Sequence, residues 1–322
     1  MDAPDPALPR LLADIGGTHA RLALQRHADA PLEAVASYEC ADFASLSAAL
    51  QHHLRSWSGP APRAMALAVA TPVDGADAVR ILNNHWSFSR AALQAEFALQ
   101  RLVVLNDFAA LALALPVLSE TELEPVCAGQ AQPGAPALVM GPGTGLGVAA
   151  LLRPPGGRPL VVSGEGGHAT LAASTPREAA VLERLWRRFG HVSAERVLSG
   201  PGLVNLYVAL SELAGAPAQA LRPADVVARA QAGSDACCAE AVALFVDFLG
   251  SVAGSLLLSF GAQGGLYLAG GVLPRLGALF DHERFATRLR AKGRLQGYLA
   301  ALPAWLIRAS QPGLLGAAQS LR

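Results

Sequence analysis

The residues that could carry chemistry begin with the run DIGGT at positions 14–18, at the end of an apolar segment. Gly16 and Gly17 permit positive φ and let backbone N–H groups approach a polyphosphate closely, with Thr18 completing the turn. Asp14 offers a carboxylate that can hold Mg²⁺ directly or through water. A tight hairpin in which Asp14 binds turn amides accounts for the same residues, so this run alone leaves both interpretations open.

Two further glycine turns follow apolar segments, GPGTGLG at 141–147 and GG at 270–271. No G-K-[ST] sequence of a P-loop occurs, and the turn at 14–18 precedes a strand-like segment, which excludes the dinucleotide fingerprint G-x-G-x-x-G. Three glycine turns without a P-loop together indicate a nucleotide site of another kind. Gly143, Thr144 and Gly145 are candidates for phosphate contact, and Gly270 and Gly271 would let a flat nucleotide base approach the backbone.

Asn106 and Asp107 stand between an apolar segment and a stretch with helical spacing. Phosphoryl transfer to a hydroxyl group needs a carboxylate that accepts the hydroxyl proton. An Asn-Asp pair at this place is also typical of a helix N-cap.

Glu165 and His168 lie in the run SGEGGH, which has few bulky side chains, and Glu195 lies in SAER. Carboxylates together with a histidine match the donors and acceptors of sugar hydroxyls. For Glu195, a capping glutamate paired with Arg196 is the alternative.

The elements that must position these residues alternate between strands and helices. Apolar segments predict strands at 11–15, 20–24, 65–70, 102–105, 137–140, 148–152 and 265–269. Helical spacing predicts helices at 43–56, 89–98, 176–189, 202–214, 223–230 and 236–259. This alternation indicates an α/β fold with two sheet-and-helix lobes. Each lobe contains one glycine hairpin, which suggests an internal duplication.

Composition narrows the function further. The chain has 322 residues, 52% of them hydrophobic and 16% charged, enough for two domains with large cores. Lys and Arg together number 25, as do Asp and Glu, so the net charge is zero and argues against a nucleic-acid partner. Lys292 is the single lysine, so any chemistry that needs a lysine must use it, which argues against P-loop ATPases, protein kinases and Schiff-base enzymes.

Cysteine spacing bears on whether the protein holds a structural metal, and its long apolar stretches bear on whether it spans a membrane. The four cysteines form no C-x-x-C pair, so we expect no structural zinc. The first ten residues hold two aspartates and three prolines, unlike a signal peptide. The uncharged stretches 125–152 and 248–274 are broken by glycines, which favours buried elements over membrane spans. We therefore expect a soluble cytoplasmic protein with no membrane partner.

In their order along the chain, DIGGT, Asn106-Asp107, GTG at 143–145 and GG at 270–271 resemble the actin/hexokinase/heat-shock-ATPase superfamily. Within it, GEGGH at 164–168 and HVSAERVLSGPG at 191–202 are similar to bacterial glucokinases. The similar passages span nearly the whole chain. The sequence lacks the cysteine-rich zinc motif of the related repressor–kinase sugar kinases.

The resemblance implies ATP-dependent phosphorylation of D-glucose at the 6-hydroxyl, with Asp107 as general base. It also implies that glucose is bound by Asn106, Asp107, Glu165, His168 and Glu195. MgATP would be bound by Asp14, Gly16, Gly17, Thr18, Gly143, Thr144, Gly145, Gly270 and Gly271, with Asp14 holding the metal. Another hexose kinase, for mannose, fructose or an amino sugar, would keep every motif. A non-catalytic sugar-sensing protein of this fold is the alternative from another class, and the intact Asp14 and Asp107 argue against it.

The fold implied by the resemblance is two-lobed and actin/hexokinase-like (ribonuclease H-like), with substrate in a cleft between a small and a large α/β domain. The small domain would comprise 1–107 completed by 304–322, and the large domain 108–303. Family members are expected to form homodimers. The chain departs from the family at His19, where asparagine is usual.

Overall fold

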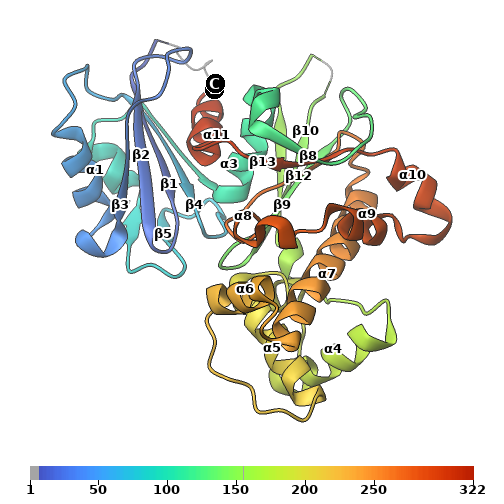
Figure 1. Ribbon diagram of the computed structural model, residues 1–322. Coiled ribbons are helices and arrows are strands. Elements are labelled where there is room, and N and C mark those ends of the chain that lie inside the picture. Colours follow the sequence, from blue (N-terminus) through green and yellow to red (C-terminus); the bar gives the residue numbers. More distant parts are fainter. Residues whose placement is uncertain (1–6, 155) are drawn as a thin grey trace. The chain divides into compact units, whose positions relative to one another are not determined.

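The computed structural model describes residues 7–154 and 156–322 (Figure 1). Residues 1–6, part of the segment that argues against a signal peptide, lie outside the described residues. The chain forms two compact units, Met1–Ser119 with Ala309–Arg322, and Glu120–Arg308.

The first unit is built on a five-stranded sheet with the order β3-β2-β1-β4-β7. Its strands are β1 (Arg10–Ile15), β2 (His19–Gln25), β3 (Glu33–Glu39), β4 (Ala64–Val69) and β7 (Arg101–Asn106), and a small hairpin is formed by β5 (Ala78–Arg80) and β6 (Ser87–Ser89). Its helices are η1 (Cys40–Asp42), α1 (Leu46–Leu54), α2 (Arg90–Glu96), α3 (Asp107–Ala114), η2 (Leu115–Val117) and α11 (Pro312–Ser320).

Three parallel strands of this sheet end in the same row. Ile15 pairs with Val69 between β1 and β4, and Val69 pairs with Asn106 between β4 and β7. The turn after β1 and the start of α3 after β7 therefore lie at one edge of the sheet, as the carboxyl ends of parallel strands do. This register brings Asp14 and Asp107 to the same edge.

The C-terminal helix α11 packs on α3, beside it in Figure 1. A Cβ added at Gly316 would lie 1.7 Å from the carbonyl oxygen of Ala110, so only glycine permits this close approach. Helix α3, which begins with Asp107, is thus packed closely against the C-terminal helix α11.

The second unit is built on a six-stranded sheet with the order β11-β10-β9-β12-β13-β8. Its strands are β8 (Leu123–Cys127), β9 (Ala137–Pro142), β10 (Leu146–Leu152), β11 (Leu160–Gly164), β12 (Leu266–Leu268) and β13 (Ala304–Ile307). Its α-helices are α4 (Pro176–Phe189), α5 (Gly200–Leu213), α6 (Pro223–Ala232), α7 (Ala236–Phe260), α8 (Leu273–Leu276), α9 (His282–Arg290) and α10 (Gln296–Ala300). Short 3₁₀ turns are η3 (Glu120–Glu122), η4 (Gly166–His168), η5 (Ala194–Arg196), η6 (Gly277–Leu279) and η7 (Gly293–Leu295).

The two sheets repeat one topology. In the first unit, β1 and β2 form an antiparallel hairpin, β3 adds to the edge of β2, and β1 pairs in parallel with β4, which is followed by β7. In the second unit, β9, β10, β11, β12 and β13 take the places of β1, β2, β3, β4 and β7. The second sheet adds only β8 at its far edge. This repetition supports the internal duplication predicted from the two glycine hairpins.

Helix α7 is the central helix of the second unit. Among the described residues it alone is long and apolar enough to cross a membrane, and 67% of its most apolar 18-residue window is buried inside the protein. It packs against α5, α6, α9 and β9. This burial explains one of the two long uncharged stretches as the core of a folded unit.

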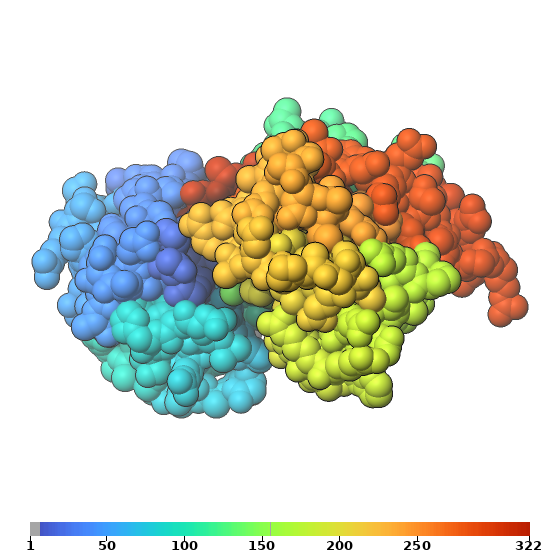
Figure 2. Space-filling view, turned by 60° about the horizontal axis from the view of Figure 1, so that its bottom comes forward, coloured from blue at the N-terminus to red at the C-terminus, as the bar shows by residue number. Residues whose placement is uncertain are grey.

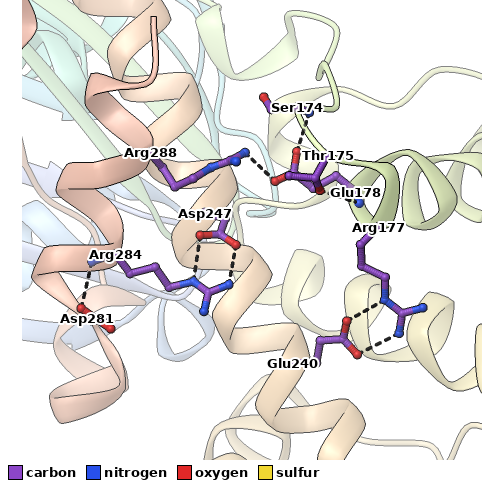
Figure 3. A network of polar contacts seen from close by, with 9 residues as sticks. All are labelled: Ser174, Thr175, Arg177, Glu178, Glu240, Asp247, Asp281, Arg284 and Arg288. Atoms are coloured by element: carbon purple, nitrogen blue, oxygen red, sulfur yellow. Dashed lines mark hydrogen bonds and ion pairs between the residues drawn. The ribbon is translucent and has the colours of Figure 1, made fainter. Parts of the chain in front are cut away.

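Ion pairs tie α4, α7 and α9 together (Figure 3). Glu178 of α4 is fully buried and accepts hydrogen bonds from Arg288 of α9 and from the backbone N–H of Ser174. Arg284 of α9 pairs with Asp247 of α7 through both of its carboxylate oxygens. Figure 2 shows α4, α5 and α6, coloured yellow-green to orange-yellow, on one face of this unit.

The unit boundaries differ from the domain boundaries expected from the sequence at 107/108 and 303/304. Helix α3 lies in the first unit because it packs on α11. Strand β13 lies in the second unit because it pairs with both β12 and β8. The segment that returns to the first unit is therefore 309–322, not 304–322.

Candidate functional site

The first unit carries the two predicted aspartates at its aligned strand ends. Asp14 is held by Arg21, whose Nη1 lies 3.3 Å from Asp14 Oδ2, and its side chain is 19% exposed. Burial raises the pKa of Asp14 despite this cation. Burial, and then the negative charge of Asp14, raise the pKa of Asp107 to about 7. A carboxylate with such a pKa is suited to accept a proton near neutral pH.

Asn106 is the N-cap of α3, as the alternative interpretation of the Asn-Asp pair predicts. Its Oδ1 accepts hydrogen bonds from the N–H groups of Phe108 and Ala109, and its Nδ2 donates to Thr71 O. The cap fixes the direction of the helix start and hence of the Asp107 side chain. A sugar contact by Asn106 stays a prediction.

The glycine turn after β1 is supported by a segment that sequence analysis did not single out. Asn84 Nδ2 donates to Gly16 O at 3.2 Å, and a Cβ added at Gly17 would lie 3.0 Å from Asn83 O. Asn84 Oδ1 in turn accepts from the N–H of the buried Trp86 at 3.0 Å. The pair Asn83-Asn84 gave a signal only as a turn, since its partner lies 68 positions away in the sequence.

His19 begins β2 and pairs across the sheet with Glu39 of β3. Its Nε2 lies 2.9 Å from Glu39 Oε1, and its side chain is 49% exposed. The carboxylate of Glu39 thus already engages one nitrogen of this ring.

The second unit brings two predicted glycine turns side by side. β9 and β12 are parallel, with Met140 opposite Leu268, so the turns that follow them meet at one edge. A Cβ added at Gly141 would lie 2.3 Å from Ala269 O, and one at Gly270, with φ +86°, would lie 2.4 Å from Pro142 O. Glycine is required at both positions by this close approach.

A cavity of about 600 Å³ opens beside these turns, within the second unit. Gly143, Thr144 and Gly271 line it, whereas Gly145 and Gly270 are not among the described residues that do. The remaining walls come from the start of α5, one face of α6 and the segment after β12, namely Gly200, Pro201, Leu203, Pro223, Ala224, Val227, Ala228, Gln231, Val272 and Arg275.

The character of this cavity suits a nucleotide. Its volume lies within the ordinary range of small-molecule sites, roughly 300–1,000 Å³. Arg275 is the one charged side chain among its described lining residues. Sequence analysis missed the α6 wall because Ala224, Val227 and Ala228 have the spacing of an ordinary core-facing stripe.

Three of the residues predicted to bind sugar, Glu165, His168 and Glu195, lie at two adjacent 3₁₀ turns of the second unit. Glu165 precedes η4, which ends at His168, and Glu195 is in the middle of η5. The two turns are joined by a hydrogen bond from Ala194 N to Ala169 O at 2.9 Å. Glu165 and His168 are exposed, and Glu195 is half-buried.

The residues that could hold a metal ion are few. Among residues 7–154 and 156–322, no three His, Cys, Asp or Glu side chains are grouped so as to hold a metal ion. Asp14 and Asp107 provide hard oxygen donors whose charges influence each other. Such a pair fits a Mg²⁺ ion that takes most of its ligands from phosphates and water.

Comparison with known proteins identifies the family. The glucokinase family model matches residues 11–322. A glucokinase of Aromatoleum aromaticum is 50% identical over 315 residues, covering 97% of this chain and 94% of that protein. A glucokinase of Paramagnetospirillum magneticum is 46% identical over 309 residues, covering 96% of each.

A crystal structure of glucokinase from an Antarctic psychrotroph is similar with a TM-score of 0.89 at 39% identity, covering 97% of this chain and 98% of that one. These matches confirm the predicted actin/hexokinase-like α/β fold and the predicted enzyme class. The chain belongs to the glucokinase family.

Proposed function

We propose that the protein transfers the γ-phosphoryl group of ATP to the 6-hydroxyl of D-glucose, with Asp107 as general base. The observation that carries this assignment is the Asp107 carboxyl at the end of β7, whose pKa is raised to about 7 by burial and by Asp14. Asp107 accepts the proton of the 6-hydroxyl as the hydroxyl oxygen bonds to the γ-phosphorus. The bond between the γ-phosphorus and the β–γ bridging oxygen breaks, and ADP leaves with that oxygen.

Glucose is oriented by side chains that match its hydroxyl groups. Glu165, His168 and Glu195 contribute two carboxylates and an imidazole from η4 and η5. Asn106 binds a hydroxyl next to the one that reacts, through the part of its amide that the helix cap leaves free. Each polar contact that the bound sugar covers favours the sugar that satisfies it, because a mismatched sugar leaves a partner unpaired.

ATP is bound by the glycine turns predicted from the sequence. The base and ribose occupy the 600 Å³ cavity lined by Gly143, Thr144 and Gly271, and Arg275 pairs with a phosphate. Gly16, Gly17 and Thr18 offer backbone N–H groups to the terminal phosphates, and Gly270, with its positive φ, gives its turn the shape it needs. Asp14 holds Mg²⁺, directly or through water, and the bound ion neutralises phosphate charge.

The remaining properties follow the sequence expectations. We propose that the protein acts as a cytoplasmic homodimer without a nucleic-acid or membrane partner, and that Mg²⁺ enters only with the nucleotide. The zero net charge supports the first exclusion.

Initial rates with glucose, mannose, fructose and N-acetylglucosamine at saturating MgATP test the substrate. Glucose is expected to give the highest kcat/KM. A higher value for another sugar would assign the protein to that hexose, and no turnover with any sugar would indicate a sugar-sensing protein.

Replacement of the base tests the mechanism. Asp107→Asn is expected to bind glucose as the wild type does and to lose about 10²- to 10⁴-fold in kcat, the usual contribution of a positioned base. Glucose affinity is measured by titration calorimetry and kcat in a coupled assay. A variant that keeps more than half of the wild-type kcat would remove Asp107 from this role.

A further inference from the structure

The side chain of Glu195 rests on the glycine turn that the sequence assigns to the nucleotide. Leu146 N donates a hydrogen bond to Glu195 Oε2 at 2.9 Å. A Cβ added at Gly145 would lie only 2.3 Å from this oxygen and 3.1 Å from the carboxyl carbon. Any side chain at position 145 would therefore displace the carboxylate from its hydrogen bond.

Backbone conformation gives no other reason for glycine at position 145. Its φ is not among the positive values found in the described part of the chain. An L-residue could therefore adopt this conformation without strain. The nucleotide cavity gives no reason either, since Gly143 and Thr144 line it and Gly145 does not. The nearest atoms that a Cβ at position 145 would meet belong to the Glu195 carboxylate, the end of a flexible side chain, which would have to move aside.

The turn η4, which carries Glu165 and His168 at its ends, lies against Leu146 as well. A Cβ added at Gly167, between Glu165 and His168, would lie 2.1 Å from the carbonyl oxygen of Leu146. Leu146 thus binds Glu195 of η5 through its N–H group, and its carbonyl oxygen lies so close to Gly167 of η4 that only glycine fits there. The N–H bond fixes one carboxylate oxygen of Glu195 and leaves the other available to a ligand.

We propose that Gly145 and the N–H group of Leu146 form a seat for the Glu195 carboxylate, so that Gly145 is a positioning residue of the sugar site and not a nucleotide contact. The inference rests on the proposed role of Glu195 in binding glucose. Under this proposal Gly145 positions a sugar-binding carboxylate, whereas Gly143 and Thr144 contact the nucleotide.

The first experiment compares three glycine-to-alanine variants. Gly145→Ala is expected to lower kcat/KM for glucose by about 10- to 100-fold, the effect of losing one hydrogen bond to a charged group, with KM for ATP within about twofold. Gly143→Ala, whose added methyl meets nothing within 4 Å, is expected to act on KM for ATP. Gly297→Ala in α10 also adds a methyl in open space and serves as the neutral control.

A double-mutant cycle separates positioning from direct contact. In a Glu195→Ala background, Gly145→Ala should lower kcat/KM for glucose by less than about twofold, because the carboxylate that it displaces is gone. Equal losses in both backgrounds, or an effect of Gly145→Ala on KM for ATP alone, would overturn the proposal.

Folding of the variants is checked by thermal unfolding. If Gly145→Ala alone does not fold, the double variant without the clashing carboxylate is expected to fold, and its failure to do so would also overturn the proposal. A wild type that phosphorylates no sugar defeats the proposed function instead. An active wild type with additive losses defeats only the assignment of Gly145.

Discussion

Asp107 owes its usefulness as a base to the same features that make its charge costly. Burial and the nearby Asp14 disfavour the carboxylate and raise its pKa to about 7. We therefore expect kcat/KM for glucose to rise with pH up to about 7 and then to level off. The check is a pH–rate profile from 5.5 to 8.5, compared with Asp14→Asn, in which the ionisation should move to lower pH because one negative charge is gone.

The raised pKa also sets the sign of the effect of Asp107 on stability. A carboxyl whose folded-state pKa is raised favours the folded state below its ordinary pKa and loses this contribution as the pH rises through about 7. Asp107→Asn should thus be at least as stable as the wild type at pH 8. A loss of activity in that variant with a lower melting temperature would point to misfolding instead.

Asn84 offers a test of how the first glycine turn is shaped. Asn84→Ala removes the donor to Gly16 O and the acceptor of Trp86 N, and we expect KM for ATP to rise about 3- to 10-fold, as for one ordinary hydrogen bond. Asn84→Asp keeps the acceptor and replaces the donor by a charged oxygen beside Gly16 O, so a rise at least as large would assign the effect to Gly16. Glucose affinity measured without nucleotide should not change, and a loss there would contradict this role.

The predictability of site residues from the sequence depended on whether their role is local. Asp107 and the glycine turns follow apolar segments, so strand ends mark them. Asn84 and Gly145 acquire their roles from partners 68 and 50 positions away, Gly16 and Glu195, and no local pattern encodes such a contact. The structure also shows the side chain of His19 engaged by Glu39, which its position after Thr18 does not predict.

At the scale of elements, α4 offers a comparison of buried and exposed ion pairs. Glu178 is fully buried against Arg288, whereas Glu183 is 54% exposed and pairs with Arg187 four residues on. Glu178→Gln should lower the free energy of unfolding by about 3–5 kcal/mol, because it leaves a guanidinium that is 15% exposed without its charge partner. Glu183→Gln should cost no more than about 0.5 kcal/mol.

Urea unfolding of both variants measures this difference. Equal costs would mean that the network in Figure 3 contributes no more than an exposed pair.

Elements were predicted well where burial was strong. The helices at 176–189 and 236–259 agree with α4 and α7 to within one residue. The strand at 11–15 agrees with β1 just as closely. Sequence analysis missed β3 and β11, which are sheet-edge strands with mostly exposed or half-buried residues, and β8, which contains Pro125. It also missed β13, which is mostly buried but has only four residues. Edge strands lack the apolar pattern because only part of their surface faces the core.

At the scale of the whole molecule, we expect the buried His53 to lower the free energy of unfolding in acid. It is 1% exposed in the first unit, its Nδ1 lies 3.1 Å from Tyr38 Oη, and Nε2 has no partner in the described part of the chain. Burial lowers its pKa, with a smaller contribution from the charge of His52. The unfolded chain therefore binds a proton first, and stability is expected to fall as the pH drops below about 6.5.

The measurement is the free energy of unfolding between pH 5 and 7.5. His53→Gln should flatten its pH dependence below about 6.5, and His27→Gln, at an exposed position, should not. An unaltered slope in His53→Gln would show that other groups dominate.

The row formed by Ile15, Val69 and Asn106 has a consequence for insertions and deletions. Deleting one residue inside β7 would move its end by about 3.3 Å and turn the following side chains to the opposite face of the sheet. Asp107 could then no longer lie beside Asp14. Residues added at exposed positions of the connections 26–32 or 55–63 leave the row intact, so the chain can become longer there while the spacing of the two aspartates stays the same.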